Sequence, residues 1–151
     1  KYYNTPPAIA VPKDSPITEA TDAGLAGKII GAQSSTTHSN YAEEKLSSAE
    51  LKLYPTPDEY KLDIASGRVD AVIDDVTVLA EWLKSDAGAC CKLLGTLTPD
   101  PVINGEGAGI AVRKGEDELR EKINAAIAAI RANGTYKEIN DKYFDVDVYG
   151  D

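Results

Sequence analysis

The sequence predicts an α/β fold in which helices flank a mostly parallel sheet. Short apolar runs of strand length alternate along residues 8–97 with segments that have the composition of helices. Glycine, proline and hydroxyl residues separate the two kinds of segment. This alternation is typical of parallel sheets, in which a helical crossover returns the chain between neighbouring strands.

The first predicted strand is the apolar run 8–11, and the second is 27–32, which begins at a glycine. The polar stretch 33–40 follows. Its hydroxyl residues precede acids and helix formers, so it indicates the start of a helix that continues through 41–46. Residues 51–54 form the third predicted strand.

Pro57 begins a second helix, and residues 69–73 predict a fourth strand. The next helix covers 76–83 and carries the only tryptophan, Trp82, on its apolar face, so this side chain is expected in the core. Two further apolar runs complete the predicted sheet, residues 92–97 and 109–112.

The segment 98–107 is rich in proline and glycine and is the clearest linker. Acids at 116–118 then indicate a helix start, and apolar side chains recur on one face from 119 to 130. Gly134 is expected to end this helix in a left-handed conformation, and a short helix covers 136–143. The apolar face follows the linker, so we expect it to pack on something other than the first sheet.

The composition excludes several classes of partner. The 151 residues carry a formal net charge of -9, which disfavours binding to nucleic acid and to anionic lipid. An acidic surface attracts small cationic solutes instead. No apolar run approaches the ~20 residues that a membrane-spanning helix needs.

The only two cysteines, Cys90 and Cys91, are adjacent. No spacing of cysteine and histidine matches a zinc or thioredoxin-like site, so we expect neither a metal nor a cofactor. Two interpretations of the pair remain open. Either one cysteine is buried while the other lies on a loop, or the two are oxidised to a strained eight-membered ring.

Two strand ends are candidates for a ligand site, because open α/β sheets bind ligands beyond the carboxyl ends of their strands. Residues 33–38 offer amides and hydroxyls at a helix start, which suits a carboxylate. Asp74 and Asp75 follow the fourth strand and could hold an ammonium group. Each feature could instead only cap a helix, but together they match the two charges of a free amino acid. The only histidine, His38, lies in no recognisable catalytic triad, so no catalytic residue is predicted.

A set of short motifs runs in order through nearly the whole chain. They are Ile9–Ile17, Leu25–Lys28, the loop 33–41, Ser66–Ala71, Gly107–Lys114, Asn133–Tyr136, Lys142–Phe144 and Tyr149–Asp151. No single motif is specific, but their order and spacing resemble the periplasmic solute-binding proteins for polar and cationic amino acids. The nearest groups are the lysine/arginine/ornithine, histidine and octopine/nopaline binders.

The resemblance implies the two-lobed fold of type II periplasmic binding proteins. Residues 1–7 would lead into the first hinge crossing, and 8–108 would form the second, ligand-closing lobe. Residues 109–112 would return through the hinge, and 113–151 would be the C-terminal helical part of an incomplete first lobe. The chain would then hold half of a binding site and bind its ligand weakly.

The resemblance also implies a function without chemical conversion, that of the solute-binding component of an amino-acid ABC importer in the periplasm of a Gram-negative bacterium. Its partners would be the permease subunits and a ligand such as arginine, lysine, ornithine, histidine or an octopine-like opine. The apolar face 119–130 would contact the absent half-lobe or a second copy. The alternatives are a ligand-sensing domain of a regulator or receptor and, as a minor one, an enzyme of the cyclohexadienyl dehydratase type.

Carried over by position, the ligand-binding residues are Gln33, Ser35, Thr36, Thr37, His38 and Asp75. In this resemblance Asp75 takes the α-ammonium group, while Thr36 and Thr37 take the carboxylate. Gln33 and His38 line the side-chain pocket. Neither of these two is expected in a strict lysine or arginine binder, so the ligand side chain stays open.

Overall fold

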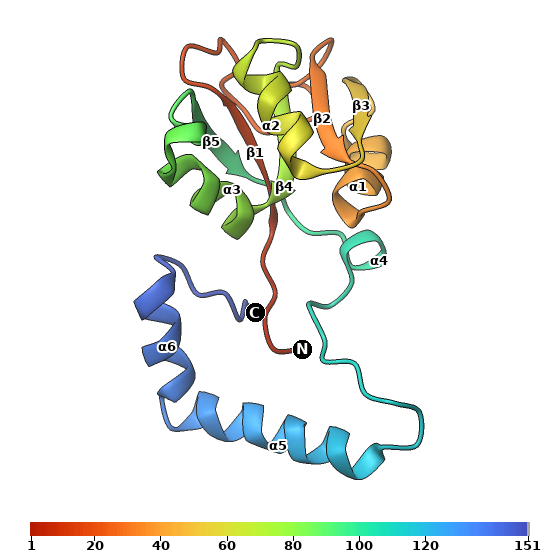
Figure 1. Cartoon of the computed structure of the whole chain (residues 1–151). Helices are drawn as coiled ribbons and strands as arrows, with labels where there is room; N and C mark the ends of the chain where they lie inside the picture. The colour runs from red at the N-terminus through yellow and green to blue at the C-terminus, as the bar shows by residue number, and fades with distance from the viewer. Residues whose placement is uncertain (151) are drawn as a thin grey trace. The chain divides into compact units, whose positions relative to one another are not determined.

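The computed structural model describes residues 1–150 and divides into two compact units (Figure 1). The larger, here called the sheet unit, is Pro6–Gly105. The smaller, here called the helical unit, combines Lys1–Thr5 with Glu106–Asp151, of which Asp151 lies outside the described residues.

The sheet unit contains one five-stranded sheet in the order β3-β2-β4-β1-β5. Strand β2 pairs in parallel with β3 and β4, whereas β1 pairs antiparallel with β4 and β5. Four strands therefore run in one direction and β1 runs against them, so the sheet is mixed. The strands are β1 (Pro7–Pro12), β2 (Ile29–Gln33), β3 (Glu50–Tyr54), β4 (Ala71–Asp75) and β5 (Cys91–Thr96).

The direction of β1 follows from where the chain enters and leaves this unit. The amide of Leu97, just after β5, donates to the carbonyl of Pro7 at the start of β1 over 2.8 Å. The end of β5 therefore lies beside the start of β1, as in any antiparallel pair, and the chain enters and leaves the unit at the same end of the sheet.

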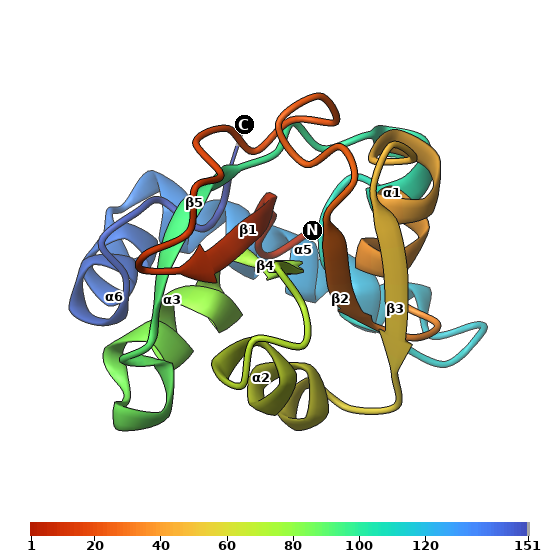
Figure 2. The same ribbon diagram turned by 90° about the horizontal axis from the view of Figure 1, so that it is seen from above.

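Helices cover both faces of the sheet (Figure 2). Helix α1 (Thr37–Lys45) lies on one face, and α2 (Pro57–Ala65) and α3 (Val76–Lys84) lie on the other. Strand β1 is buried on both sides, with Ile9 in the cluster under α1 and Ala8 in the cluster under α2 and α3. This accounts for its continuous apolar run. Trp82 belongs to the second cluster, which confirms its predicted place in the core.

The predicted helix boundaries of the sheet unit are confirmed by local hydrogen bonds. Thr36 and Ser39 form a reciprocal capping box at the start of α1. At the start of α2 the carboxylate of Glu59 accepts from the amide of Thr56 over 3.1 Å. Gly67 follows α2 with φ of 74°, a conformation that side chains with a Cβ rarely adopt.

The helical unit consists mainly of α5 (Asp117–Ala132) and α6 (Thr135–Tyr143), both predicted from the sequence. Gly134 separates them with φ of 85°, as expected for a left-handed helix end. The buried side chain of Asn140 then fixes the chain after α6. Its Nδ2 donates to the carbonyl of Val146 over 2.9 Å, and its Oδ1 accepts from the amide of Val148 over 2.9 Å.

Of the expectations for residues 98–112, the strand needs correction, whereas the linker is borne out by the boundary between the two units at Gly105 and Glu106. The predicted strand 109–112 is wrong, since within residues 1–150 this run forms no strand and Ala108 makes only an isolated bridge with Tyr3. A strand needs a partner over several residues, and Ile110, which is 50% exposed, has none here. The predicted linker contains a short helix, α4 (Pro101–Asn104), and the sheet unit also includes a 3₁₀ turn at Asp86–Gly88. No helix in the described range is long and apolar enough to cross a membrane.

Candidate functional site

The two candidate loops lie at the same end of the sheet, where β2 and β4 have their carboxyl ends. Strands β2 and β4 are parallel neighbours, with Gly31 opposite Val72, so their carboxyl ends meet there. The donor-rich loop 33–38 leaves one end, and Asp74 and Asp75 close the other. A side-chain contact joins the two loops, since Nδ1 of His38 lies 3.5 Å from Oδ1 of Asp74.

The loop after β2 is shaped by its own hydrogen bonds. Ser35 has φ of 60°, the only non-glycine residue with positive φ among those described. The hydroxyl of Thr36 accepts from the amide of Ser39 over 3.1 Å and donates to the carbonyl of Gln33 over 2.8 Å. Thr36 therefore caps α1, which is the role that the sequence analysis gave as the alternative to ligand binding. Its side chain also fixes the turn. The first amides of α1, which include that of Thr37, have no acceptor within the helix and form its positive end.

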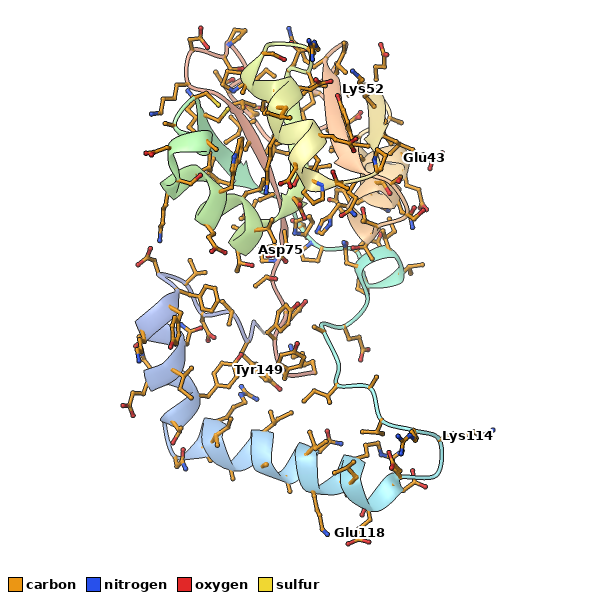
Figure 3. All side chains as sticks on the ribbon, in the orientation of Figure 1. Glu43, Lys52, Asp75, Lys114, Glu118 and Tyr149 are labelled. Carbon is orange, nitrogen blue, oxygen red and sulfur yellow. The ribbon has the colours of Figure 1, made fainter. Side chains whose placement is uncertain are left out.

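The side chain of Asp75 stands at the junction of β4 and α3 (Figure 3). It is half-buried, and its Oδ1 accepts from both the amide and the hydroxyl of Thr77, over 2.8 and 2.5 Å. Asp75 is thus the N-cap of α3. An ionised carboxylate has about four acceptor positions, so capping a helix does not exhaust its capacity to accept hydrogen bonds.

Asp74 is a further member of the site. The sequence analysis named it beside Asp75 as a possible acceptor for an ammonium group, but only Asp75 was carried over as a ligand-binding residue. It accepts hydrogen bonds from the phenol of Tyr60 on α2 and, over 2.7 Å, from the amide of Asp75. Tyr60 is fully buried, and this burial, together with the charge of Asp74, raises the pKa of Tyr60 far above its usual value. Tyr60 therefore donates as a neutral phenol to Oδ2 of Asp74, while Oδ1 of the same carboxylate faces His38.

The described residues offer little for other kinds of site. Within residues 1–150, no group of three or more His, Cys, Asp or Glu side chains could hold a metal ion. A cavity of about 590 Å³ lies in the helical unit between α6 and the chain that follows it. Arg131, Tyr136 and Tyr149 contribute to its lining, and none of the predicted site residues does.

Solved structures identify the class of fold. An ancestral arginine-binding protein bound to arginine is similar with a TM-score of 0.75 and 33% identity, over 95% of this chain and 62% of that one. A periplasmic binding protein of Salmonella typhimurium with high arginine specificity is similar with a TM-score of 0.73 and 30% identity, over 95% and 62% of the two chains. The fold is that of the type II periplasmic binding proteins, as the sequence predicted.

The family model of the bacterial extracellular solute-binding proteins, family 3, matches residues 1–146, and the chain belongs to this family. The L-arginine-binding protein of Pseudomonas aeruginosa is 46% identical over 99% of this chain and 59% of its own length. The histidine-binding periplasmic protein of Salmonella typhimurium is 37% identical over 99% of this chain and 58% of its own length. The chain thus spans less than two thirds of the length of these relatives.

Proposed function

We propose that this chain supplies one face of a binding site for a free polar or cationic amino acid, or an opine, in the solute-binding component of an amino-acid ABC importer. Family membership and relatives named for arginine and histidine binding support the proposal. The observation that carries it is the 3.5 Å contact between His38 and Asp74, which joins the donor loop to the acidic strand end.

The proposed ligand contacts follow the charges of the site. The positive start of α1, with the exposed hydroxyl of Thr37, receives the ligand carboxylate. The carboxylate of Asp75 accepts from the α-ammonium group, and Gln33, Ser35 and His38 face the ligand side chain. Thr36 holds the shape of the loop through its cap. Charge-assisted hydrogen bonds contribute roughly 1.5–3 kcal/mol each, so micromolar affinity near -8 kcal/mol requires several of them.

We further propose that the two units belong to different lobes. The sheet unit is the ligand-closing lobe, and the helical unit is part of the other lobe. The division of the chain near residues 5 and 106 supports this organisation. The protein works in the periplasm and delivers its ligand to membrane permease subunits, in line with periplasmic relatives.

Heteronuclear NMR suits this proposal, because a single face of a site binds weakly and chemical shifts report weak binding. Arginine, lysine, ornithine, histidine and octopine are titrated into the labelled chain. We expect amide shifts to concentrate at 34–38 and 74–77. Asp75→Asn should abolish them, whereas Glu43→Gln, which removes an exposed acid elsewhere on α1, should not.

Ligand analogues provide the second control. Agmatine lacks the carboxylate of arginine, and N-acetylarginine lacks its ammonium group, so neither should shift both loops. Shifts that stay the same in Asp75→Asn, or that map to other edges of the sheet, would remove the basis of the proposed site. The family membership would be unaffected.

The apolar face of α5 is the second surface that we propose to be functional. No residue of α5 is buried, and Leu119 is 45% exposed. We propose that this face packs against the remaining part of its lobe in a longer protein, and against a second copy when the chain is alone. Light scattering should then show a mass that rises with concentration, and Leu119→Lys should abolish the rise. Ala128→Lys, on the opposite side of α5, is the control, and a monomer at all concentrations would contradict the proposal.

A further inference from the structure

The adjacent thiols of Cys90 and Cys91 are in direct contact. Their Sγ atoms lie 2.6 Å apart, and both cysteines are free. Cys91 is the first residue of β5 and only 3% exposed, whereas Cys90 is exposed to solvent. The interpretation with one buried and one accessible cysteine is therefore confirmed. In addition, the two sulfurs are close enough to react with each other.

We propose that Cys90 and Cys91 form a reversible redox site, which closes to a vicinal disulfide when an external disulfide oxidises it. The oxidant is a disulfide of the glutathione or thiol-oxidase class. Cys90 as thiolate attacks one sulfur of the oxidant and releases the first reduced thiol. Cys91 then loses its proton to solvent and attacks Sγ of Cys90, which releases the second. Two protein thiols are oxidised, and one external disulfide is reduced to two thiols.

The order of the two steps follows from the surroundings of the sulfurs. Burial and the hydrogen bond with Cys90 raise the pKa of Cys91 to about 12, so Cys91 stays protonated at neutral pH. The accessible Cys90 is therefore the first nucleophile, since the thiolate is the attacking form. Once Cys90 carries the mixed disulfide, its sulfur is already in contact with that of Cys91 for the second step.

The closed ring should be easy to reduce again. Adjacent Cα atoms are about 3.8 Å apart across a trans peptide bond, below the usual range of roughly 4.4–6.8 Å for disulfides. Such strain makes a disulfide more oxidising and therefore labile. The ring also encloses almost no chain, so it constrains the unfolded state very little. These properties indicate a reversible redox switch and not a disulfide that stabilises the fold.

The redox site lies at the opposite end of the sheet from the candidate ligand site. Cys91 pairs with Pro12 at one end of β1, and Asp75 pairs with Pro7 at the other. The carbonyl of Cys90 also accepts from the amide of Lys13 over 3.0 Å. Closure of the disulfide changes the backbone at this end of β1 and β5, away from the candidate ligand site. The redox proposal therefore does not depend on the proposed ligand binding.

The test is a redox titration of the full chain in glutathione buffers of increasing oxidised fraction. Samples are quenched with acid, unfolded, treated with N-ethylmaleimide and analysed by intact mass and by a non-reducing gel. We expect oxidised monomers to be lighter by two hydrogen atoms and to take up no label, with both thiols lost in one transition. Dithiothreitol should restore both labels.

Single variants separate closure from other oxidation products. Neither Cys90→Ser nor Cys91→Ser can close a ring. Cys91→Ser keeps the accessible thiol and should yield a glutathione adduct or a disulfide-linked dimer, whereas Cys90→Ser keeps only the buried thiol and should stay reduced and take up one label after unfolding. Cys90→Ser changes an exposed side chain, so its result stands even where Cys91→Ser unfolds. Three outcomes for the wild-type chain in the most oxidising buffer would overturn the proposal. They are uptake of two labels, two glutathione adducts, or dimers linked through Cys90.

Discussion

The hydrogen bond from Tyr60 to Asp74 should stabilise the sheet unit measurably, and Tyr60→Phe isolates it. The substitution removes one buried hydroxyl and leaves the ring in the core. Hydrogen bonds to charged groups contribute about 1.5–3 kcal/mol to stability. The side chain of Asp74 is 13% exposed, so water replaces the lost donor only in part. We therefore expect Tyr60→Phe to lower the free energy of unfolding by about 2 kcal/mol.

Circular dichroism during heating and urea unfolding measures this change. For a chain of this length, about 2 kcal/mol corresponds to a fall in Tm of roughly 4–8 °C. Tyr143→Phe is the matched control, because Tyr143 is 65% exposed and its loss of a hydroxyl should change stability by less than about 0.5 kcal/mol.

A double-mutant cycle with Asp74→Asn shows whether the effect belongs to this pair. The two changes should be non-additive by roughly 1 kcal/mol or more, because each removes the same hydrogen bond. Tyr60→Phe with a Tm equal to that of Tyr143→Phe would refute the reasoning. Strict additivity with Asp74→Asn would refute it as well.

Three further substitutions test the elements that position the site. Thr36→Ala removes the cap of α1 and should lower stability by about 1 kcal/mol in urea unfolding. Leu79→Ala opens a cavity at a fully buried position and should cost about 2–5 kcal/mol in the same assay. Hydrogen bonds, first of all that from Tyr54, hold the pKa of Asp63 well below its usual value. Its stabilising effect is therefore full above the unfolded pKa of about 3.9 and is lost as pH falls. Below about pH 4, Tm should fall more steeply in the wild type than in Asp63→Asn.

The order and type of the main elements could be predicted from the sequence because each has a local signal. Apolar runs locate the strands, and hydroxyl residues and glycines locate the helix ends. Pairing partners have no such signal. The run 109–112 has the composition of a strand, but a strand also requires a neighbour. In the described residues the nearby bridge joins Tyr3 to Ala108, which precedes the run. The opposite direction of β1 depends on contacts with β4 and β5, far away in the sequence.

The same distinction applies to the site. The meeting of the loop 33–38 with the end of β4 could be expected, because carboxyl ends of parallel neighbours share an edge. The role of Asp74 could not. It depends on Tyr60, which lies on a helix on one face of the sheet, and on His38, which lies at the start of a helix on the other. No periodicity or spacing in the sequence connects these three residues.

Asp75 both caps α3 and, in the proposed function, binds the ligand ammonium group, so its two roles must be separated. Asparagine is as good an N-cap as aspartate, but it carries no charge. Asp75→Asn should therefore keep the stability of the sheet unit and lose the ligand-induced shifts, whereas Asp75→Ala should lose both, with a loss of stability of about 1 kcal/mol. If Asp75→Asn still bound arginine as the wild type does, the carboxylate would be a helix cap and nothing more.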